Sequence, residues 1–299
     1  MTKAAISLAG VFPPIPTPFD ERGEVHYATL ADNLARWNEY GLAGYVVLGS
    51  NGEAVYLTDE EKVRILETCR RAIPADKLLI AGTGAQSTRA TIDLTRRAAE
   101  AGADAALVVT PHYYIGKMTS EALVRHYHAL ADASPIPVMI YNVPGFTGVD
   151  MAVDALARAA EHPNLVGMKD TAGNITKLAD TVRAAGPGFQ VLAGSAGFFL
   201  TGLVVGAVGG VLALANIAPQ RALDIYYLFR AGNLEEAAEL QRRMIPVNVA
   251  VTAGLGIAGL KAALDMLGYY GGPVRPPLLD LTGAQRETLR AILVEGGAL

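Results

Sequence analysis

Cysteine is almost absent from this sequence, because Cys69 is the one cysteine in 299 residues. A single thiol forms no internal disulfide and supplies no cysteine-rich metal site, and we expect it to be buried in a helix. Charged residues make up only 18% of the chain, the formal net charge is −4, and no basic run occurs. The sequence therefore lacks the electrostatic signature of a nucleic-acid-binding protein, and we predict no nucleic-acid partner.

Several metal-binding and catalytic motifs are also missing. The five histidines have no metal-ligand spacing, since His126 and His128 stand two residues apart and would lie on different faces of a helix. No G-x-S-x-G or P-loop pattern occurs. Glu53 and the acidic residues from Asp59 to Glu61 are typical of a turn and a helix start rather than of a catalytic carboxylate pair. We therefore predict no metal site.

Long hydrophobic runs are rare, and the one long uncharged stretch spans residues 191–220. Its length resembles that of a transmembrane helix. Its six glycines, among them the pair Gly209–Gly210, favour a strand, a short helix and a second strand in a protein core instead. The N-terminus has no signal-peptide pattern, so we predict a cytoplasmic protein with no membrane partner.

Hydrophobic residues, in contrast, are abundant at 51% of the chain, which predicts a large core and little disorder. Apolar runs rich in β-formers alternate with helical patterns, and this alternation predicts a parallel sheet covered by helices. Eight such units favour an α/β fold of the closed (β/α)8 TIM-barrel type. A doubly wound open sheet is the alternative, disfavoured because no G-x-G-x-x-G follows the first run. The runs are "GVFPPIPTPF", "GYVVLGS", "KLLIAGTG", "AALVVTP", "PVMIYNVP", "LVGMKDT", "FQVLAGS" and "GGVLALAN".

The pattern changes after Ala231, where all the remaining segments are helical. We predict a catalytic barrel over residues 1–232 and a C-terminal helical appendage over residues 233–299. No long polar linker joins the two, so the appendage should pack on the barrel.

Polar side chains gather where the predicted strands end, which is the active face of a parallel barrel. The strand bodies are apolar, so this pattern predicts a polar site at one end of a packed core. The "GSNGE" turn after the second run could bind a carboxylate through its backbone N–H groups and a hydroxyl. The candidates at the strand ends are Ser50, Asn51, Thr83, Tyr113, Tyr114, Tyr141, Asn142, Lys169, Thr171, Ser195 and Asn216.

The most unusual of these residues is Lys169 in "LVGMKDT". Strand alternation places Lys169 on one face with Gly167 and Thr171, and Asp170 on the other face. If Lys169 points into the barrel, burial disfavours its ammonium form, and a neutral amine is what attack on a carbonyl needs. The alternative is a lysine paired with Asp170 at a wet rim. Tyr141, at the end of the neighbouring strand, favours catalysis because it is a plausible proton shuttle.

The order of the motifs "PTPF", "GSNGE", "VVTPHYY", "YNVP", "GMKD" and "GGVLALAN" resembles one known family over nearly the whole chain. This family is the pyruvate-dependent class I aldolases of the dihydrodipicolinate synthase and N-acetylneuraminate lyase group. Within it, "GMKDTAGNITK", "VLAGSAGF" and "GYYGGPVRPPL" resemble the 4-hydroxy-2-oxoglutarate aldolases.

The resemblance implies that Lys169 forms a Schiff base with the ketone of a 2-oxo acid and that Tyr141 is the general acid/base. Tyr113 matches a tyrosine that reaches into a neighbouring subunit's site, with Tyr114 as the alternative. The family is mostly tetrameric, so a homotetramer, a dimer of dimers, is expected. No metal or organic cofactor is needed, because the lysine imine is the electron sink. The substrate-binding candidates are Ser50 in the proton relay, Asn51 for the carboxylate, Thr171 near the imine, Ser195, and the backbone carbonyl of Leu212.

Two departures from the family pattern bear on the substrate. Phe146 stands where the lysine-pathway synthases carry an arginine for the aldehyde's carboxylate, and Asn51 replaces a hydroxyl residue. Both favour cleavage of 4-hydroxy-2-oxoglutarate to pyruvate and glyoxylate. The alternatives are 4-hydroxy-tetrahydrodipicolinate synthase, which condenses pyruvate with aspartate semialdehyde, a 2-keto-3-deoxy sugar acid aldolase or dehydratase, and a non-catalytic binder of 2-oxo acids.

Overall fold

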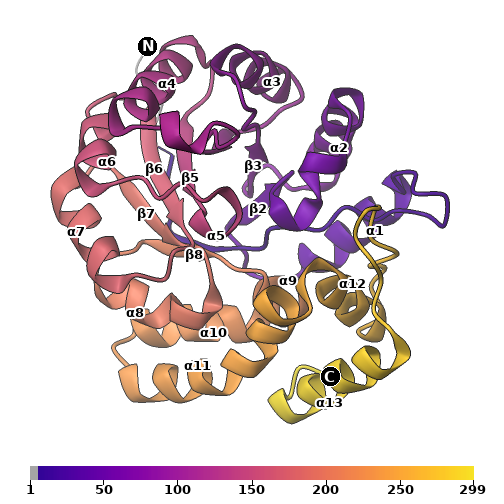
Figure 1. Ribbon diagram of the computed structural model, residues 1–299. Coiled ribbons are helices and arrows are strands. Elements are labelled where there is room, and N and C mark those ends of the chain that lie inside the picture. Colours follow the sequence, from indigo (N-terminus) through magenta and orange to yellow (C-terminus); the bar gives the residue numbers. More distant parts are fainter. Residues whose placement is uncertain (1–5) are drawn as a thin grey trace.

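The predicted β-rich runs form eight parallel strands in the computed structural model, which describes residues 6–299. Neighbouring strands follow chain order around the sheet. The first and second strands close it, since Ala43 N donates to Val11 O (3.1 Å) and Ile15 N to Val46 O (3.0 Å). The predicted (β/α)8 barrel is therefore confirmed (Figure 1). The strands are β1 (Gly10–Phe12), β2 (Gly44–Val47), β3 (Leu78–Gly82), β4 (Ala105–Val109), β5 (Val138–Asn142), β6 (Leu165–Asp170), β7 (Gln190–Ala193) and β8 (Gly209–Val211).

Helices surround the strands on the outside of the barrel (Figure 1). The predicted capping box is present, because Thr58 and Glu61 exchange hydrogen bonds at the start of the second helix. Cys69 is fully buried in the same helix, as expected. The helices of the barrel are α1 (Tyr27–Trp37), α2 (Asp59–Ala72), α3 (Thr88–Glu100), α4 (Ser120–Ala133), α5 (Pro144–Thr147), α6 (Val153–Ala160), α7 (Ile175–Ala185), α8 (Phe199–Val204), α9 (Leu214–Ile217) and α10 (Pro219–Arg230).

The core has two layers, because alternate residues of each strand face opposite sides. One layer fills the barrel interior, where Leu8, Phe12, Ile80 and Leu192 are fully buried. The larger layer lies between the strands and the helices. A side chain at Gly167 would come within 2.1 Å of the Gln190 carbonyl oxygen, so only glycine lets β6 and β7 approach this closely.

The uncharged stretch 191–220 forms β7, α8 and β8 and then runs into α9, as predicted. Within residues 6–299, no helix has both the length and the hydropathy needed to cross a membrane. The glycine pair 209–210 belongs to β8, where a side chain at Gly209 would come within 2.2 Å of the Gly10 carbonyl oxygen.

The C-terminal region consists of α11 (Leu234–Val249), a π-helical turn (Ala250–Gly254), α12 (Gly256–Met266) and α13 (Gly283–Gly296). The predicted boundary at 232/233 falls between α10 and α11. Residues 267–282, here called the strap, connect α12 to α13. The strap is yellow in Figure 1 and runs beside α1. Asn33 Nδ2 of α1 donates to Tyr270 O of the strap (2.8 Å), and Tyr270 Oη donates to Phe19 O (2.9 Å).

Candidate active site

Lys169 and Tyr141 lie opposite each other on the paired strands β6 and β5. The Lys169 side chain points toward the barrel interior, with its Nζ atom 4.1 Å from the centroid of the Tyr141 ring. Lys169 is only 4% exposed, yet within residues 6–299 its Nζ atom makes no hydrogen bond and no ion pair. The alternative of a pair with Asp170 at a wet rim is therefore wrong.

Asp170 lies on the other face of β6, where it is held by Asn142 of β5. Asn142 Nδ2 donates to Asp170 Oδ1 (2.7 Å) and to Asp150 Oδ1 (2.8 Å), and Lys177 pairs with Asp150. Burial raises the pKa of Asp170, and the hydrogen bond from Asn142 opposes this shift. Because Asn142 follows Tyr141 and Asp170 follows Lys169, these bonds fix the two candidate catalytic residues in register.

Ser50 brings a hydroxyl to this pair from the turn after β2. Its Oγ atom lies 3.3 Å from Tyr141 Oη, in hydrogen-bond contact. The turn begins after Leu48, a buried residue with a φ of 61°, which is strained backbone for a non-glycine residue. Asn51 follows Ser50, and its buried Nδ2 atom has no partner within residues 6–299. Such an unpaired donor beside a hydroxyl suits a bound anion.

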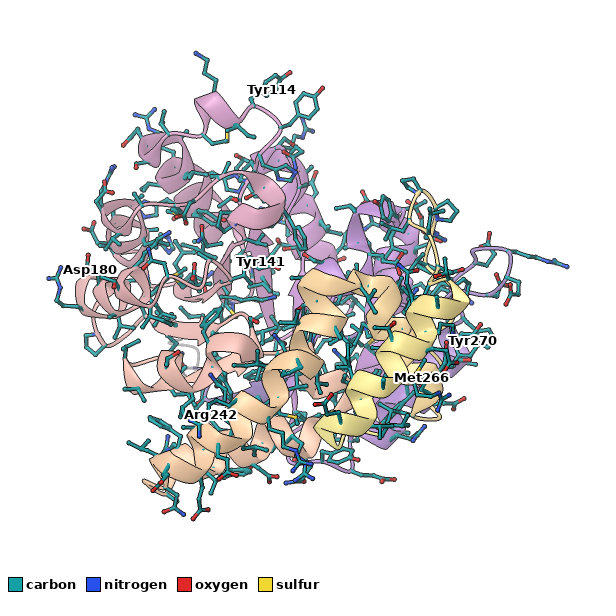
Figure 2. All side chains as sticks on the ribbon, turned by 60° about the horizontal axis from the view of Figure 1, so that its bottom comes forward. Tyr114, Tyr141, Asp180, Arg242, Met266 and Tyr270 are labelled. Atoms are coloured by element: carbon teal, nitrogen blue, oxygen red, sulfur yellow. The ribbon has the colours of Figure 1, made fainter. Side chains whose placement is uncertain are left out.

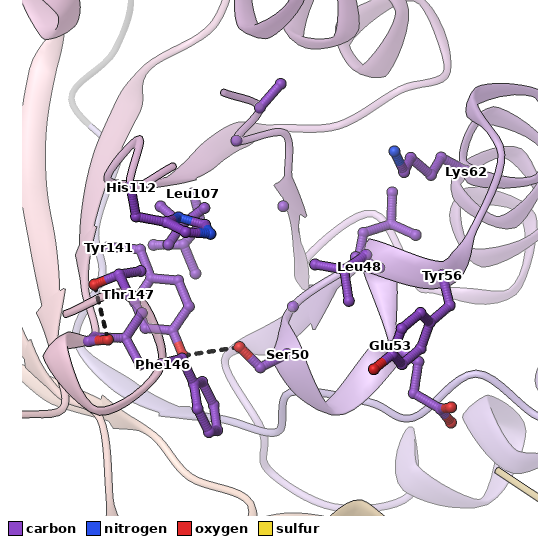
Figure 3. A pocket seen from close by; sticks show the side chains of 18 of the residues that line it. Leu48, Ser50, Glu53, Tyr56, Lys62, Leu107, His112, Tyr141, Phe146 and Thr147 are labelled. Carbon is purple, nitrogen blue, oxygen red and sulfur yellow. Dashed lines mark hydrogen bonds between the residues drawn. The ribbon is translucent and has the colours of Figure 1, made fainter. Parts of the chain in front are cut away.

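A cavity of about 470 Å³ opens at the carboxyl ends of β2 to β5. Ser50 and Tyr141 line it, so the hydroxyl relay faces open space (Figure 3). Phe146, His112 and Lys62 are among the other lining residues. Phe146 is 74% exposed, which leaves an apolar ring, not a cation, at this side of the cavity.

Tyr113 and Tyr114 point away from the core and are 77% and 69% exposed. Figure 2 shows Tyr114 at the outer edge of the molecule, away from Tyr141. Their loop is anchored by Gln86, whose Oε1 atom accepts from His112 N (2.9 Å) and Tyr113 N (2.8 Å). Within one chain, these tyrosines are therefore not part of the Lys169 site.

Three predicted substrate-binding groups are already occupied by hydrogen bonds within the protein. Thr171 Oγ1 donates to Asn142 O (3.0 Å), and the Leu212 carbonyl accepts from Ala215 N (3.0 Å). Ser195 Oγ accepts from Asn248 Nδ2 of α11 (3.2 Å). None of the three lines the cavity, and neither do Lys169 and Asn51.

Two other predicted positions are buried and hydrogen-bonded within the protein. Thr83 is fully buried and bonds Thr95 (2.8 Å), and Asn216 Nδ2 donates to Pro14 O (3.1 Å). In the described part of the chain, no group of three or more His, Cys, Asp or Glu side chains is arranged to hold a metal ion.

Sequence reasoning missed the pair formed by Glu53 and Lys261. Glu53 lines the cavity wall and is fully buried, with Lys261 Nζ 2.6 Å from its Oε1 atom. The signal was present, because Lys261 is a lone lysine in the apolar stretch "AGLKAALDML", just as Lys169 is in "LVGMKDT". Only the fold shows that one of these lysines has a carboxylate partner.

Known proteins match this chain over nearly its whole length. The sequence profile of the Dihydrodipicolinate synthetase family matches residues 7–295. A probable mitochondrial 4-hydroxy-2-oxoglutarate aldolase of Emericella nidulans is 40% identical over 96% of this chain and 94% of its own. A 4-hydroxy-tetrahydrodipicolinate synthase of Methanoculleus marisnigri is 36% identical, over 96% of this chain and 99% of its own.

A solved structure has the same fold as this chain. It is the chloride-inhibited dihydrodipicolinate synthase of Acinetobacter baumannii complexed with pyruvate, which is 34% identical to this chain. It superposes with a TM-score of 0.93 over 98% of this chain and 100% of its own. The chain therefore belongs to the dihydrodipicolinate synthetase family, and it is an enzyme, a lyase of the pyruvate-dependent aldolase type.

Proposed function

We propose that the protein is a Schiff-base aldolase that cleaves a 4-hydroxy-2-oxo acid, with 4-hydroxy-2-oxoglutarate as the preferred substrate. The observation that carries this proposal is the Lys169 amine, which is buried without a carboxylate partner and lies against Tyr141. The similarity to the Emericella nidulans aldolase supports the choice of substrate.

In the first step, the Lys169 amine attacks the C2 ketone of the substrate. Tyr141 hands a proton to the leaving hydroxyl, and water departs to leave a protonated imine. Ser50 takes part in the proton relay, since its hydroxyl lies 3.3 Å from Tyr141 Oη. The C1 carboxylate binds the Asn51 backbone N–H and the side chains of Ser50 and Asn51, where the Asn51 Nδ2 donor is unpaired within residues 6–299. The Gly52 N–H is not available, because it donates to the Gly49 carbonyl (3.0 Å).

In the second step, Tyr141, assisted by the substrate's own carboxylate, takes the proton of the C4 hydroxyl. The C3–C4 bond breaks, its electron pair moves into the imine to form an enamine, and glyoxylate leaves. Protonation of C3 and hydrolysis of the imine release pyruvate and restore the amine. The chain uses no metal or organic cofactor in this scheme, because the imine accepts the electron pair.

Condensation of pyruvate with aspartate semialdehyde is the second candidate reaction, because relatives such as the Methanoculleus marisnigri protein are named synthases. The phenyl ring of Phe146 gives no charge-assisted bond to the carboxylate of aspartate semialdehyde, and it gives none to the C5 carboxylate of 4-hydroxy-2-oxoglutarate either. The preference for the aldolase reaction therefore rests on the higher identity to the Emericella nidulans aldolase. Cleavage of 4-hydroxy-2-oxoglutarate should therefore exceed the synthase reaction when both are assayed with the same preparation.

A homotetramer is part of the proposal. The exposed Tyr113 and Tyr114 leave apolar rings on the surface near the barrel mouth, where a second subunit would cover them. In this assembly Tyr113 reaches the partner's site, and Thr171, Ser195 and Leu212 hold the strand ends around the substrate. The cytoplasmic location stays a prediction, and the Emericella nidulans relative is named mitochondrial.

The test is borohydride reduction in the presence of pyruvate, followed by intact mass and peptide mapping. We expect one pyruvate-derived adduct per chain, on Lys169. The peptide that carries Lys261 is the internal control, since its amine is paired and should stay unmodified. If no adduct forms while pyruvate still raises the Tm, the protein is a binder of 2-oxo acids and the aldolase proposal is wrong.

A further inference from the structure

We propose that Glu53 and Lys261 are positioning residues for the carboxylate-binding turn. Their buried ion pair holds the Ser50–Gly52 turn in the shape that aligns Ser50 with Tyr141 and presents Asn51 to the substrate. This inference rests on the proposed function, because it assigns the turn to the substrate's carboxylate.

The pair is among the most deeply buried charged groups in the described part of the chain. The Lys261 side chain is 1% exposed and the Glu53 side chain 0% exposed. Lys261 Nζ lies 2.6 Å from Glu53 Oε1, donates to Pro273 O (2.7 Å), and sits 4.3 Å from the centroid of the Phe19 ring. Buried ion pairs stabilise a fold little better than apolar residues of similar volume. Stability alone therefore does not account for this pair.

The backbone of Glu53 supports the same inference. Its φ of 53° and ψ of 34° lie in the left-handed region, between two short 3-10 turns. Glycine or asparagine adopts this conformation at lower energy than glutamate does. Strained positions of this kind persist where surrounding contacts hold them, and they gather at functional sites. The glutamate is therefore there for its carboxylate, which anchors the turn to α12.

The connection to the site is short. Glu53 N donates to the Ser50 carbonyl (3.1 Å), so the two residues belong to one turn. Figure 3 shows Ser50 between Tyr141 on one side and Glu53 on the other, with the Glu53 carboxylate directed away from Ser50. Glu53 thus acts through the backbone of the turn rather than on the substrate. A change in its orientation shifts the Ser50 hydroxyl and the N–H groups of the turn together.

The second carboxylate oxygen ties the turn to the strap. Glu53 Oε2 accepts from Arg275 N (2.8 Å), and the Arg275 guanidinium binds both oxygens of Glu61 and the carbonyl of Tyr56. Arg275 therefore bridges the strap and the start of α2. The C-terminal region therefore contacts the turn that carries Ser50, although Lys169 and Tyr141 come from the barrel.

The experiment compares Lys261→Met with a matched control, Arg70→Met. Arg70 pairs with Asp104 (3.0 Å) before β4, at the opposite end of the barrel from the site. For each variant we would measure the Tm, the pyruvate concentration that gives half-maximal borohydride-trapped adduct, and kcat. All adduct measurements are made at a temperature where circular dichroism shows the variant to be fully folded.

We expect both substitutions to lower the Tm, but only Lys261→Met to raise the half-saturating pyruvate concentration, by at least tenfold. If Lys261→Met does not fold, the double variant Glu53→Gln/Lys261→Met replaces it, since no unpaired charge then remains buried. Half-saturation within twofold of wild type, in whichever variant folds, overturns the positioning role. Absence of an adduct in the wild-type protein instead contradicts the proposed function, so the two failures are distinguishable.

Discussion

Within residues 6–299 two lysines are buried, and they differ in their polar partners. Lys261 in α12 has a carboxylate 2.6 Å away and a carbonyl oxygen 2.7 Å away. Lys169 in β6 faces the Tyr141 ring at 4.1 Å, with no carboxylate partner within residues 6–299. Both lie in apolar stretches of the sequence and both are at most 4% exposed. Burial alone therefore does not distinguish a nucleophile from a structural cation.

The presence or absence of a carboxylate partner distinguishes the two lysines. Burial lowers the pKa of Lys261, and the Glu53 carboxylate opposes this shift and favours the ammonium form. An ammonium held in this way has no lone pair with which to attack a ketone. The Lys169 amine has no such carboxylate, and it lies beside a hydroxyl relay that can move protons. The predictions below test whether this difference is the one that matters.

The largest effect should follow from Lys169→Met. Turnover of 4-hydroxy-2-oxoglutarate should fall to background and the trapped adduct should disappear, because the electron sink is lost. The Tm should stay level or rise, since a buried amine without a carboxylate is replaced by an apolar chain of similar length. Turnover by the purified variant above one-hundredth of the wild-type rate would show that Lys169 is not the nucleophile.

Tyr141→Phe should slow the reaction by about 10²- to 10⁴-fold, the usual contribution of a positioned acid/base group. Tyr127→Phe is the matched control, since the Tyr127 hydroxyl is buried and donates to Val108 O (3.0 Å) away from the cavity. The control should lose a little stability and no activity. Equal kcat values for the two variants would remove Tyr141 from the mechanism.

Glu53→Gln should lower the free energy of unfolding by about 3–5 kcal/mol, because Lys261 is left buried without its counter-charge. Urea unfolding at constant pH measures the change. Adding Lys261→Met to the same chain should recover most of the loss. If the single variant is as stable as wild type, the pair is not buried in solution as it is in this structure, and the contrast between the two lysines is lost.

The smallest effect concerns His126, a buried base of α4 that also lacks a charged partner. Its Nδ1 atom contacts Thr88 Oγ1 (2.9 Å), and burial lowers its pKa from 6.5 to about 4. The unfolded chain takes up a proton near pH 6.5 and the folded chain does not. Above pH 6.5 the protonation of His126 should therefore not affect the free energy of unfolding. As the pH drops from 6.5 to 4, it should lower the free energy of unfolding by up to about 3 kcal/mol.

The check is the urea midpoint of wild type and His126→Gln between pH 4 and pH 8. The wild-type midpoint should fall more steeply below pH 6.5 than the midpoint of the variant. Parallel curves would show that His126 takes up a proton in the folded state as readily as in the unfolded one.

The sequence by itself determined the architecture and the identity of the central residues. Alternating apolar runs and helical patterns dictated the barrel, because periodicity fixes which face of each element is buried. The period of two along "LVGMKDT" placed Lys169 and Asp170 on opposite faces, and the structure confirms it. Glycines in residues 191–220 broke the apparent membrane span into strands and short helices.

Only the tertiary structure decided which polar groups remain free. Thr171, Ser195 and Thr83 carry hydroxyls at strand ends, yet each is bonded to a partner that is distant in the sequence or on another element. Glu53 and Lys261 are more than two hundred positions apart, so no local pattern reveals their contact. Charge compensation in a core depends on which segments the fold brings together, and for that reason a lone buried lysine is ambiguous in a sequence and resolved in a structure.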